Sequence, residues 1–111
     1  MTQTVAVVTY RLPDGTDREA ALQMFRDSIP RYKETDGLLR KKVVYQEGVG
    51  GGVYLWESRE AAEAAYSDEW KAYMTEKYNH SPKLVFYEAP ITMDRQYNTV
   101  YDESAVPQAA E

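Results

Sequence analysis

Three segments of this chain are apolar at every position, so they fit strands that must be covered on both faces. They are residues 5–8 (Val-Ala-Val-Val), 53–56 (Val-Tyr-Leu-Trp) and 84–87 (Leu-Val-Phe-Tyr). The second segment constrains the fold most, because three glycines precede it and Ser58 can cap a helix that begins at Arg59. We therefore predict a buried central strand that leads directly into a helix, and we expect the pocket of the protein beside this junction.

The rest of the sequence alternates between strand and helix patterns. Turn signals at Pro13-Asp14-Gly15 and Asp36-Gly37 separate the patterns. The run Arg40-Lys41-Lys42 is typical of an edge strand that is protected by charge. We predict strands over residues 2–11, 38–46, 53–56 and 83–93, and helices over 16–34 and 59–78.

Local signals refine the boundaries of these elements. Thr16-Asp17-Arg18-Glu19 fits a capping box in which Thr16 opens the first helix. Pro30 lies inside that helix and predicts a kink or a short break, because proline lacks the N–H donor and crowds the preceding turn. Ser67-Asp68 can cap a second helical piece within 59–78. Residues 47–51 (Glu-Gly-Val-Gly-Gly) fit a flexible hairpin connection.

The predicted order β-α-β-β-α-β is that of the ferredoxin-like α+β fold, an antiparallel sheet with two helices on one face. Two helices leave the other apolar face bare, and a homodimer joined sheet against sheet is the simplest way to cover it. We assign residues 1–93 to this domain and 94–111 to a C-terminal arm or tail with a disordered end. Tyr97, Val100 and Tyr101 could lay such an arm on another surface.

Composition narrows the classes of partner and site. The chain of 111 residues carries a net charge of −5 and no basic run longer than residues 40–42, which argues against nucleic acid and anionic membranes. With no cysteine it has no disulfide, thiolate metal site or cysteine nucleophile. We also find no leader sequence and no apolar run of membrane-spanning length, so we predict a soluble cytoplasmic protein.

Aromatic side chains gather on the strand at 53–56 and on one side of the helix that follows it. We predict that they line the pocket beside this junction and bind its substrate. The alternative, that they are core aromatics beneath the helix, stays open, because burial and binding favour the same residue types. The predicted substrate-binding residues are Tyr54, Trp56, Tyr66, Trp70 and Tyr73.

The sequence does not identify a catalytic residue. His80 is the only side chain whose ordinary pKa suits base catalysis near neutral pH, but it lies in a loop, where solvent exposure is more common. Tyr66 is the second candidate. One histidine and no cysteine predict no metal site, and we expect no cofactor.

The stretch Gly51–Ala64 (GGVYLWESREAAEA) resembles the dimeric α/β-barrel superfamily of antibiotic-biosynthesis monooxygenase-like proteins, and within it the YdhR-type putative monooxygenases. The resemblance covers residues 5–93. Its further motifs are Pro30-Arg31-Tyr32, Gly37-Leu38-Leu39-Arg40-Lys41, Ser67-Asp68-Glu69-Trp70, Pro82-Lys83 and Phe86-Tyr87-Glu88-Ala89-Pro90.

The resemblance implies a dimer whose two sheets form a barrel, with a pocket in each protomer between sheet and helices. It also implies a cofactor-independent monooxygenase that acts on an aromatic or polycyclic small molecule in that pocket. In the haem-degrading branch a helix histidine follows the strand tryptophan by ten positions; here Trp56 is followed by Tyr66, so haem degradation is not expected. Two alternatives remain. One is a non-catalytic small-molecule-binding or stress-response protein of the same fold. The other is an isomerase or lyase, for which the sequence offers no acid–base pair.

Overall fold

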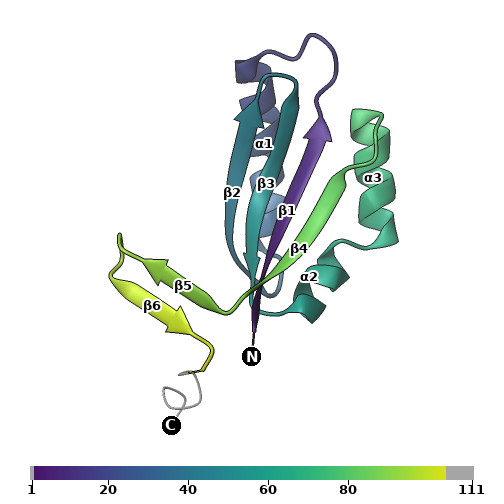
Figure 1. The fold of residues 1–111 in the computed structure, drawn as a ribbon. Helices are drawn as coiled ribbons and strands as arrows, with labels where there is room; N and C mark the ends of the chain where they lie inside the picture. The colour runs from purple at the N-terminus through teal and green to yellow at the C-terminus, as the bar shows by residue number, and fades with distance from the viewer. Residues whose placement is uncertain (1, 105–111) are drawn as a thin grey trace.

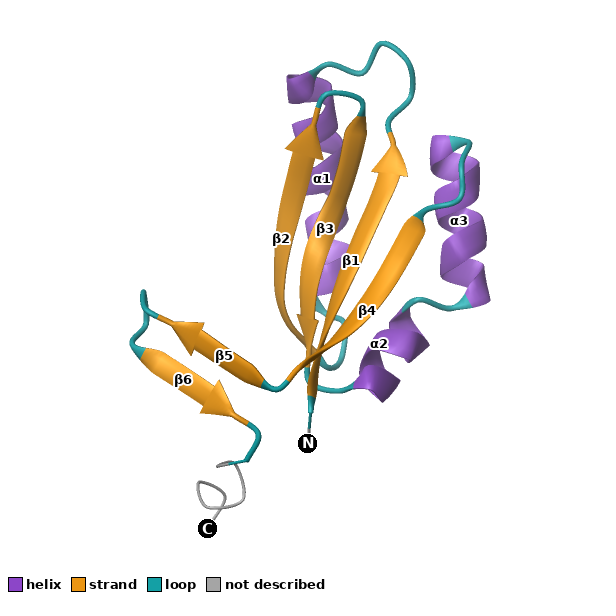
Figure 2. Cartoon of the chain, in the orientation of Figure 1, coloured by secondary structure: helices purple, strands orange, loops and turns teal. Residues whose placement is uncertain are grey.

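The computed structural model describes residues 2–104, and Figure 1 shows how its elements are arranged. The strands are β1 (Gln3–Arg11), β2 (Leu38–Gln46), β3 (Val49–Trp56), β4 (Lys83–Ala89), β5 (Ile91–Asp94) and β6 (Thr99–Asp102). The helices are α1 (Arg18–Lys33), α2 (Arg59–Ala65) and α3 (Asp68–Tyr78). The first four strands form an antiparallel sheet in the order β2-β3-β1-β4, and the helices lie on one side of it (Figure 2). This is the predicted ferredoxin-like α+β fold.

Alternate residues of the central strands lie on opposite faces of the sheet, one toward the helices and one away from them. Ala6 of β1 pairs with Tyr54 of β3 and Phe86 of β4, in the phase that faces the helices. Ala6, Tyr54 and Trp56 are all at most 4% exposed. In the other phase Val7 pairs with Val53, and both are only partly buried because no helix covers that face. The protein core therefore lies between the sheet and the helices, and the opposite face is bare.

Helix α1 differs from its sequence prediction at two points. The N-cap is Asp17 rather than Thr16: its Oδ1 accepts from the Ala20 N–H at 2.8 Å, and the helix begins at Arg18. Pro30 does not interrupt the helix, which runs to Lys33. Both Pro30 and Arg26, whose carbonyl loses its usual donor, are exposed, so water can satisfy that carbonyl. The missing hydrogen bond is therefore tolerated.

The prediction of a flexible connection over residues 47–51 is wrong for the glycines. The turn is confined to Glu47 and Gly48, with Gly48 at φ +80°, while Gly50 and Gly51 lie inside β3 and are buried. Strand β3 consequently begins at Val49, four residues before the apolar segment. Its glycines leave space on the helix-facing side, which aromatic side chains of the candidate site occupy.

The second predicted helix is two helices, as the Ser67-Asp68 signal allowed. Ser58 caps α2, accepting from the Ala61 N–H at 3.1 Å, and Ser67 caps α3, accepting from the Trp70 N–H at 3.1 Å. Asn79, at φ 63°, ends α3. The change of direction between the two helices lets α3 run back along the sheet (Figure 1). Tyr66, at the junction, packs on Tyr54 and Trp56 of β3.

The predicted strand over 83–93 is broken at Pro90, which has no N–H to continue the ladder. Strands β5 and β6 then pair as a separate hairpin that projects away from the main sheet (Figure 1). Arg40 of β2 holds this hairpin by an ion pair with Asp94, Nη2 to Oδ2 2.9 Å. The predicted disorder of the C-terminal end falls on residues 105–111, outside the described residues. No helix among residues 2–104 is long and apolar enough to cross a membrane.

Candidate functional site

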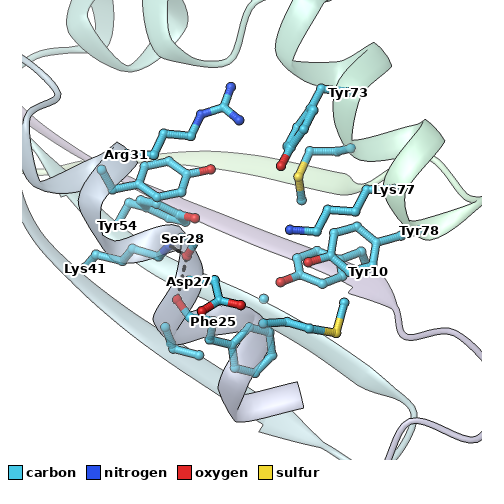
Figure 3. Close-up of a pocket in the computed structure, with 15 residues that line it drawn as sticks. Tyr10, Phe25, Asp27, Ser28, Arg31, Lys41, Tyr54, Tyr73, Lys77 and Tyr78 are labelled. Carbon is cyan, nitrogen blue, oxygen red and sulfur yellow. Dashed lines mark hydrogen bonds between the residues drawn. The ribbon is translucent and has the colours of Figure 1, made fainter. Parts of the chain in front are cut away.

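A cavity of about 260 Å³ lies between the sheet and the helices α1 and α3 (Figure 3). Tyrosine side chains from both helices and from two strands form much of its wall. A hollow of about 420 Å³ adjoins it and shares Tyr32, Lys41 and Val43 with it. The cavity is lined by Tyr10, Met24, Phe25, Asp27, Ser28, Arg31, Tyr32, Lys41, Val43, Gly51, Tyr54, Tyr73, Met74, Lys77 and Tyr78.

Flat aromatic surfaces border the cavity at both ends. Tyr10 of β1 stacks on Tyr78 of α3, with ring centroids 4.1 Å apart. Tyr32 of α1 meets Tyr54 of β3 edge to face at 5.5 Å. A bound ligand with a planar ring would find several ring faces and edges against which it could pack.

The glycines of β3 create the space for these rings. A Cβ on Gly52 would lie 2.8 Å from Cε1 of Tyr54, too close for the ring to keep its position. A Cβ on Gly50 would lie 2.8 Å from Cζ of Phe25 and 3.0 Å from Cε2 of Tyr10. The triple glycine therefore has a structural role in the pocket, since any side chain at Gly50 or Gly52 would displace an aromatic wall.

Three basic side chains accompany the tyrosines: Lys41 of β2, Lys77 of α3 and Arg31 of α1. The Arg31 guanidinium lies over the ring of Tyr73 at 4.5 Å, and the Lys77 amine lies 5.5 Å from the ring centre of Tyr78. In Figure 3 Lys77 reaches inward from α3, toward the side of the cavity where Lys41 and Tyr54 lie. The cavity thus combines aromatic walls with positive charge.

Lys41 is the most enclosed of these cations. Its Nζ lies 3.7 Å from the ring centre of Tyr32, 5.0 Å from that of Tyr54, and 3.5 Å from Oγ of Ser28, to which it donates. Burial, with a smaller contribution from the charge of Lys77, lowers the pKa of Lys41 to about 8. At neutral pH this ammonium is therefore charged, but it gives up its proton more easily than an exposed lysine.

Two of the five predicted substrate-binding residues, Tyr54 and Tyr73, line the cavity. The other three lie in a packed layer beside it. Trp56 is 0% exposed, and Tyr66 and Trp70 are each 4% exposed. The ring of Tyr66 packs edge to face against Tyr54, Trp56 and Trp70, with centroids 5.6, 5.6 and 4.9 Å away. Contact of these three residues with a ligand stays a prediction.

Indole hydrogen bonds fix this layer. Trp56 Nε1 donates to the Tyr66 hydroxyl at 3.2 Å, within the core. Trp70 Nε1 donates to the Tyr32 hydroxyl at 3.0 Å and so connects α3 to the cavity wall on α1. Burial raises the pKa of Tyr66 above its ordinary value, so the anionic form, which could accept a proton from a substrate, is disfavoured. The layer supports the cavity by holding Tyr32 and Tyr54 in place.

His80, the other predicted catalytic candidate, lies elsewhere. It is exposed in the loop after α3, and it borders an open hollow together with Thr9, Arg11 and Val49. His80 is not among the residues that line the tyrosine-walled cavity. A catalytic role for it stays a prediction that would require chemistry at this second hollow.

Sequence reasoning missed the basic residues and three of the tyrosines, Tyr10, Tyr32 and Tyr78. Lys41 belongs to the charged run of β2, which pointed only to edge protection. The position of Lys41 along the strand was the available signal. Lys41 pairs with Tyr54, and Tyr45 with Gly50, on the helix-facing side of β3, so these alternate residues of β2 also face the helices. Among residues 2–104, no group of three or more metal-ligating side chains gathers at one point.

No protein-family model matches the chain, and no curated protein matches its sequence. Solved structures do match. A protein of unknown function from Nitrosomonas europaea has a TM-score of 0.65 at 14% identity, over 80% of this chain and 90% of its own. A monooxygenase from the ActVA-Orf6 gene of Streptomyces coelicolor, in complex with nanaomycin D, has a TM-score of 0.58 at 19% identity, over 79% and 88%.

SnoaB, a cofactor-independent oxygenase from Streptomyces nogalater, has a TM-score of 0.60 at 11% identity, over 84% of this chain and 98% of its own. Similar structures also include proteins described as putative antibiotic biosynthesis monooxygenases from Caulobacter crescentus and Bordetella bronchiseptica. At such identities the likeness concerns the fold. The chain has the fold of the antibiotic-biosynthesis monooxygenase-like proteins.

Proposed function

We propose that this protein is a monooxygenase of the YdhR type that oxidises an aromatic or polycyclic small molecule without a metal or an organic cofactor. The observation that carries the proposal is the tyrosine-walled cavity between the sheet, α1 and α3. Two proteins of the same fold add support, because one is described as a cofactor-independent oxygenase and the other as a monooxygenase with nanaomycin D bound.

The size and lining of the cavity suit such a ligand. Ligand pockets commonly have volumes of ~300–1,000 Å³. The cavity of about 260 Å³ lies just below this range, and the adjoining hollow extends it past Tyr32 and Lys41. A planar ring system could occupy the cavity with its rim in the hollow. Tyr54 and Tyr73 are the predicted binding residues best placed to contact it.

The proposed chemistry needs only the substrate and dioxygen. A methylene group that is acidified by conjugation through aromatic rings to a carbonyl loses a proton, and the resulting carbanion transfers an electron to O₂. Recombination forms a C–O bond, and cleavage of the O–O bond then leaves a carbonyl on the carbon and releases the second oxygen atom as water. The methylene supplies all the electrons that O₂ takes up, so no external reductant is required. The protein contributes orientation and charge stabilisation.

Anthrone provides a direct test, because its methylene is of this kind and its product, anthraquinone, is readily detected. We expect chelator-treated protein to consume O₂ and form anthraquinone in equal amounts. Dihydroanthracene has the same ring skeleton without the carbonyl and should not react. Binding of anthrone without O₂ uptake would refute the enzyme proposal and favour the non-catalytic binding protein. Absence of both would refute an aromatic-ligand pocket.

Two neighbouring valines of β2 offer matched variants. Val43 lines the cavity, whereas Val44 lies on the bare face, and the two are 38% and 37% exposed. Val43→Phe should block the cavity and reduce turnover at least ~tenfold, because it removes space that the ring would occupy. Val44→Phe adds the same ring on the bare face, outside the cavity, and should leave turnover unchanged in a sample whose sedimentation matches that of the wild type. Equal activity in both variants would place the reaction elsewhere.

The proposed assembly is a homodimer joined through the bare faces of the two sheets, in the cytoplasm. Val7, Val53 and Val85 lie side by side on this face, in register across three strands. The projecting hairpin carries further exposed apolar side chains, Ile91, Met93 and Val100, which are 64%, 67% and 69% exposed. Apolar surface on this scale favours coverage by a second copy. The hairpin would then be the arm predicted from the C-terminal sequence.

A further inference from the structure

We propose that Lys41 forms an anion-binding subsite in the cavity, which selects aromatic ligands that carry an acidic hydroxyl and binds them as the oxyanion. The inference rests on the aromatic-ligand cavity of the proposed function and adds the charge state of the ligand and the residue that recognises it. Lys41 is then a specificity-determining residue, and it acts by contact with the ligand oxygen.

Lys41 has no carboxylate partner among residues 2–104. The ion pairs between described residues are Arg26–Glu19, Arg40–Asp94 and Arg59–Glu63. Lys41 instead donates to Ser28 Oγ at the long distance of 3.5 Å and lies over the Tyr32 ring. A partly buried ammonium without a counter-ion is costly for the fold, and an anionic ligand would remove that cost.

Most of the charged side chains around the cavity are positive. From α3, Lys77 contributes a second cation that acts on Lys41 through space, and Arg31 of α1 adds a third. Asp27 of α1 is the one acidic side chain among the residues that line the cavity; it is exposed, and its Oδ1 accepts from Gln23 Nε2 at 2.9 Å. The balance of charge in the cavity is therefore positive, in a chain whose net charge is −5.

The Lys41 ammonium lies beside the ring surfaces of the cavity wall. The Lys41 amine is within 5.0 Å of the ring centres of both Tyr32 and Tyr54. A ligand ring that packs on these tyrosines would bring a hydroxyl on its edge to the amine. An ionised hydroxyl accepts a charge-assisted hydrogen bond there, which is stronger than a neutral one. This geometry favours a phenolate or enolate over a neutral ring.

Lawsone, a hydroxylated naphthoquinone, and its methyl ether are suitable probes, since only lawsone ionises while the rings are the same. We expect the protein to bind lawsone at least ~tenfold more tightly than the ether, a difference of ~1.4 kcal/mol. Lys41→Met should remove this preference and leave affinity for the ether within ~twofold. Lys42→Met is the matched control, because it removes the same charge from the exposed neighbouring residue on the opposite face of β2.

The pH dependence gives a second readout. The titratable and charged groups that line the cavity with Lys41 are Tyr10 from β1, Asp27, Arg31 and Tyr32 from α1, Tyr54 from β3, and Tyr73, Lys77 and Tyr78 from α3. Burial raises the pKa of Tyr54, so this phenol stays neutral while Lys41, with its pKa of about 8, loses its proton. Lawsone affinity should therefore fall as pH rises above about 8. Lys41→Arg should keep the preference without this fall, because arginine stays charged.

The possible results are distinct. A preference for lawsone that survives in Lys41→Met would overturn the subsite, and so would an equal loss for both ligands. Binding of both compounds without any preference would overturn the subsite and leave the aromatic cavity intact. If neither compound binds, the subsite and the aromatic-ligand cavity fail together.

Discussion

Tyr66→Phe separates the two interpretations of the aromatic residues around β3. The substitution removes one oxygen and keeps the ring, so the contacts of Tyr66 with Tyr54, Trp56 and Trp70 are preserved. The hydroxyl oxygen accepts from Trp56 Nε1 at 3.2 Å, and the two side chains are 4% and 0% exposed. The variant therefore leaves a fully buried indole N–H without its acceptor.

The expected cost follows from that unpaired donor. A buried polar group that loses its partner costs ~1–3 kcal/mol, and the 3.2 Å distance, at the long end for N–H···O, places the cost in the lower half of that range. We expect a loss of ~1–2 kcal/mol in the free energy of unfolding, or ~4–10 °C in Tm for a domain of this size. Urea titration and thermal unfolding both measure it.

Two controls make this result interpretable. Tyr97→Phe removes the same oxygen from a side chain that is 65% exposed, and it should change stability by less than ~0.5 kcal/mol. In a double-mutant cycle with Trp56→Phe, the coupling energy should be ~0.5–1.5 kcal/mol, because both changes act on one hydrogen bond. Lawsone affinity should stay within ~twofold of wild type, because Tyr66 does not line the cavity. Unchanged stability together with a large loss of binding would refute the core role.

Three further expectations concern charge, packing and assembly. Lys41→Met should stabilise the protein by ~1–2 kcal/mol at neutral pH. The pKa of Lys41 is about 8 in the folded protein and 10.5 ordinarily, so between these two pH values the unfolded chain binds more protons than the folded protein. Wild-type stability therefore rises with pH in this interval, and the gain from the substitution shrinks. A constant gain at all pH values in urea titrations would contradict this. Gly51→Ala would bring its Cβ against the Val8 carbonyl oxygen and should cost more than ~2 kcal/mol, whereas Gly48→Ala, with open space but φ +80°, should cost ~1 kcal/mol. Sedimentation should show a dimer that Val7→Lys converts to a monomer, because Val7 lies between Val53 and Val85 on the bare face; a wild-type monomer at micromolar concentration would rule out that interface.

Capping and turn signals located most boundaries, because they depend on neighbouring residues alone. Ser58 and Ser67 cap the helices that they were expected to cap. Pro90 was expected inside a strand over 83–93, and the structure instead ends β4 before it for lack of a donor. Where several neighbouring residues offer the same chemistry, local signals do not choose. Thr16 and Asp17 are both competent caps, and the approach of the Ala20 N–H decides for Asp17.

The sequence by itself determined the fold and the two phases of its strands, because side-chain alternation is a local property and an apolar strand has to be covered on both sides. Alternation puts Val53 and Leu55 on one face of the sheet and Tyr54 and Trp56 on the other, and the structure places the second pair on the helix side. The glycines before them were misplaced, since nothing local distinguishes a flexible glycine from one that must clear the rings of Tyr10, Phe25 and Tyr54.

Only the tertiary structure decided which aromatic residues border a cavity and which cations accompany them. Tyr54 and Trp56 share one face of one strand, yet the first lines the cavity and the second is enclosed by Tyr66. Lys41, Lys77 and Arg31 come from three separate elements, and their charges gather when α1 and α3 pack on the sheet. Strand pairing and helix packing bring together residues that are far apart in the chain. A local sequence pattern does not show which of these distant residues will meet.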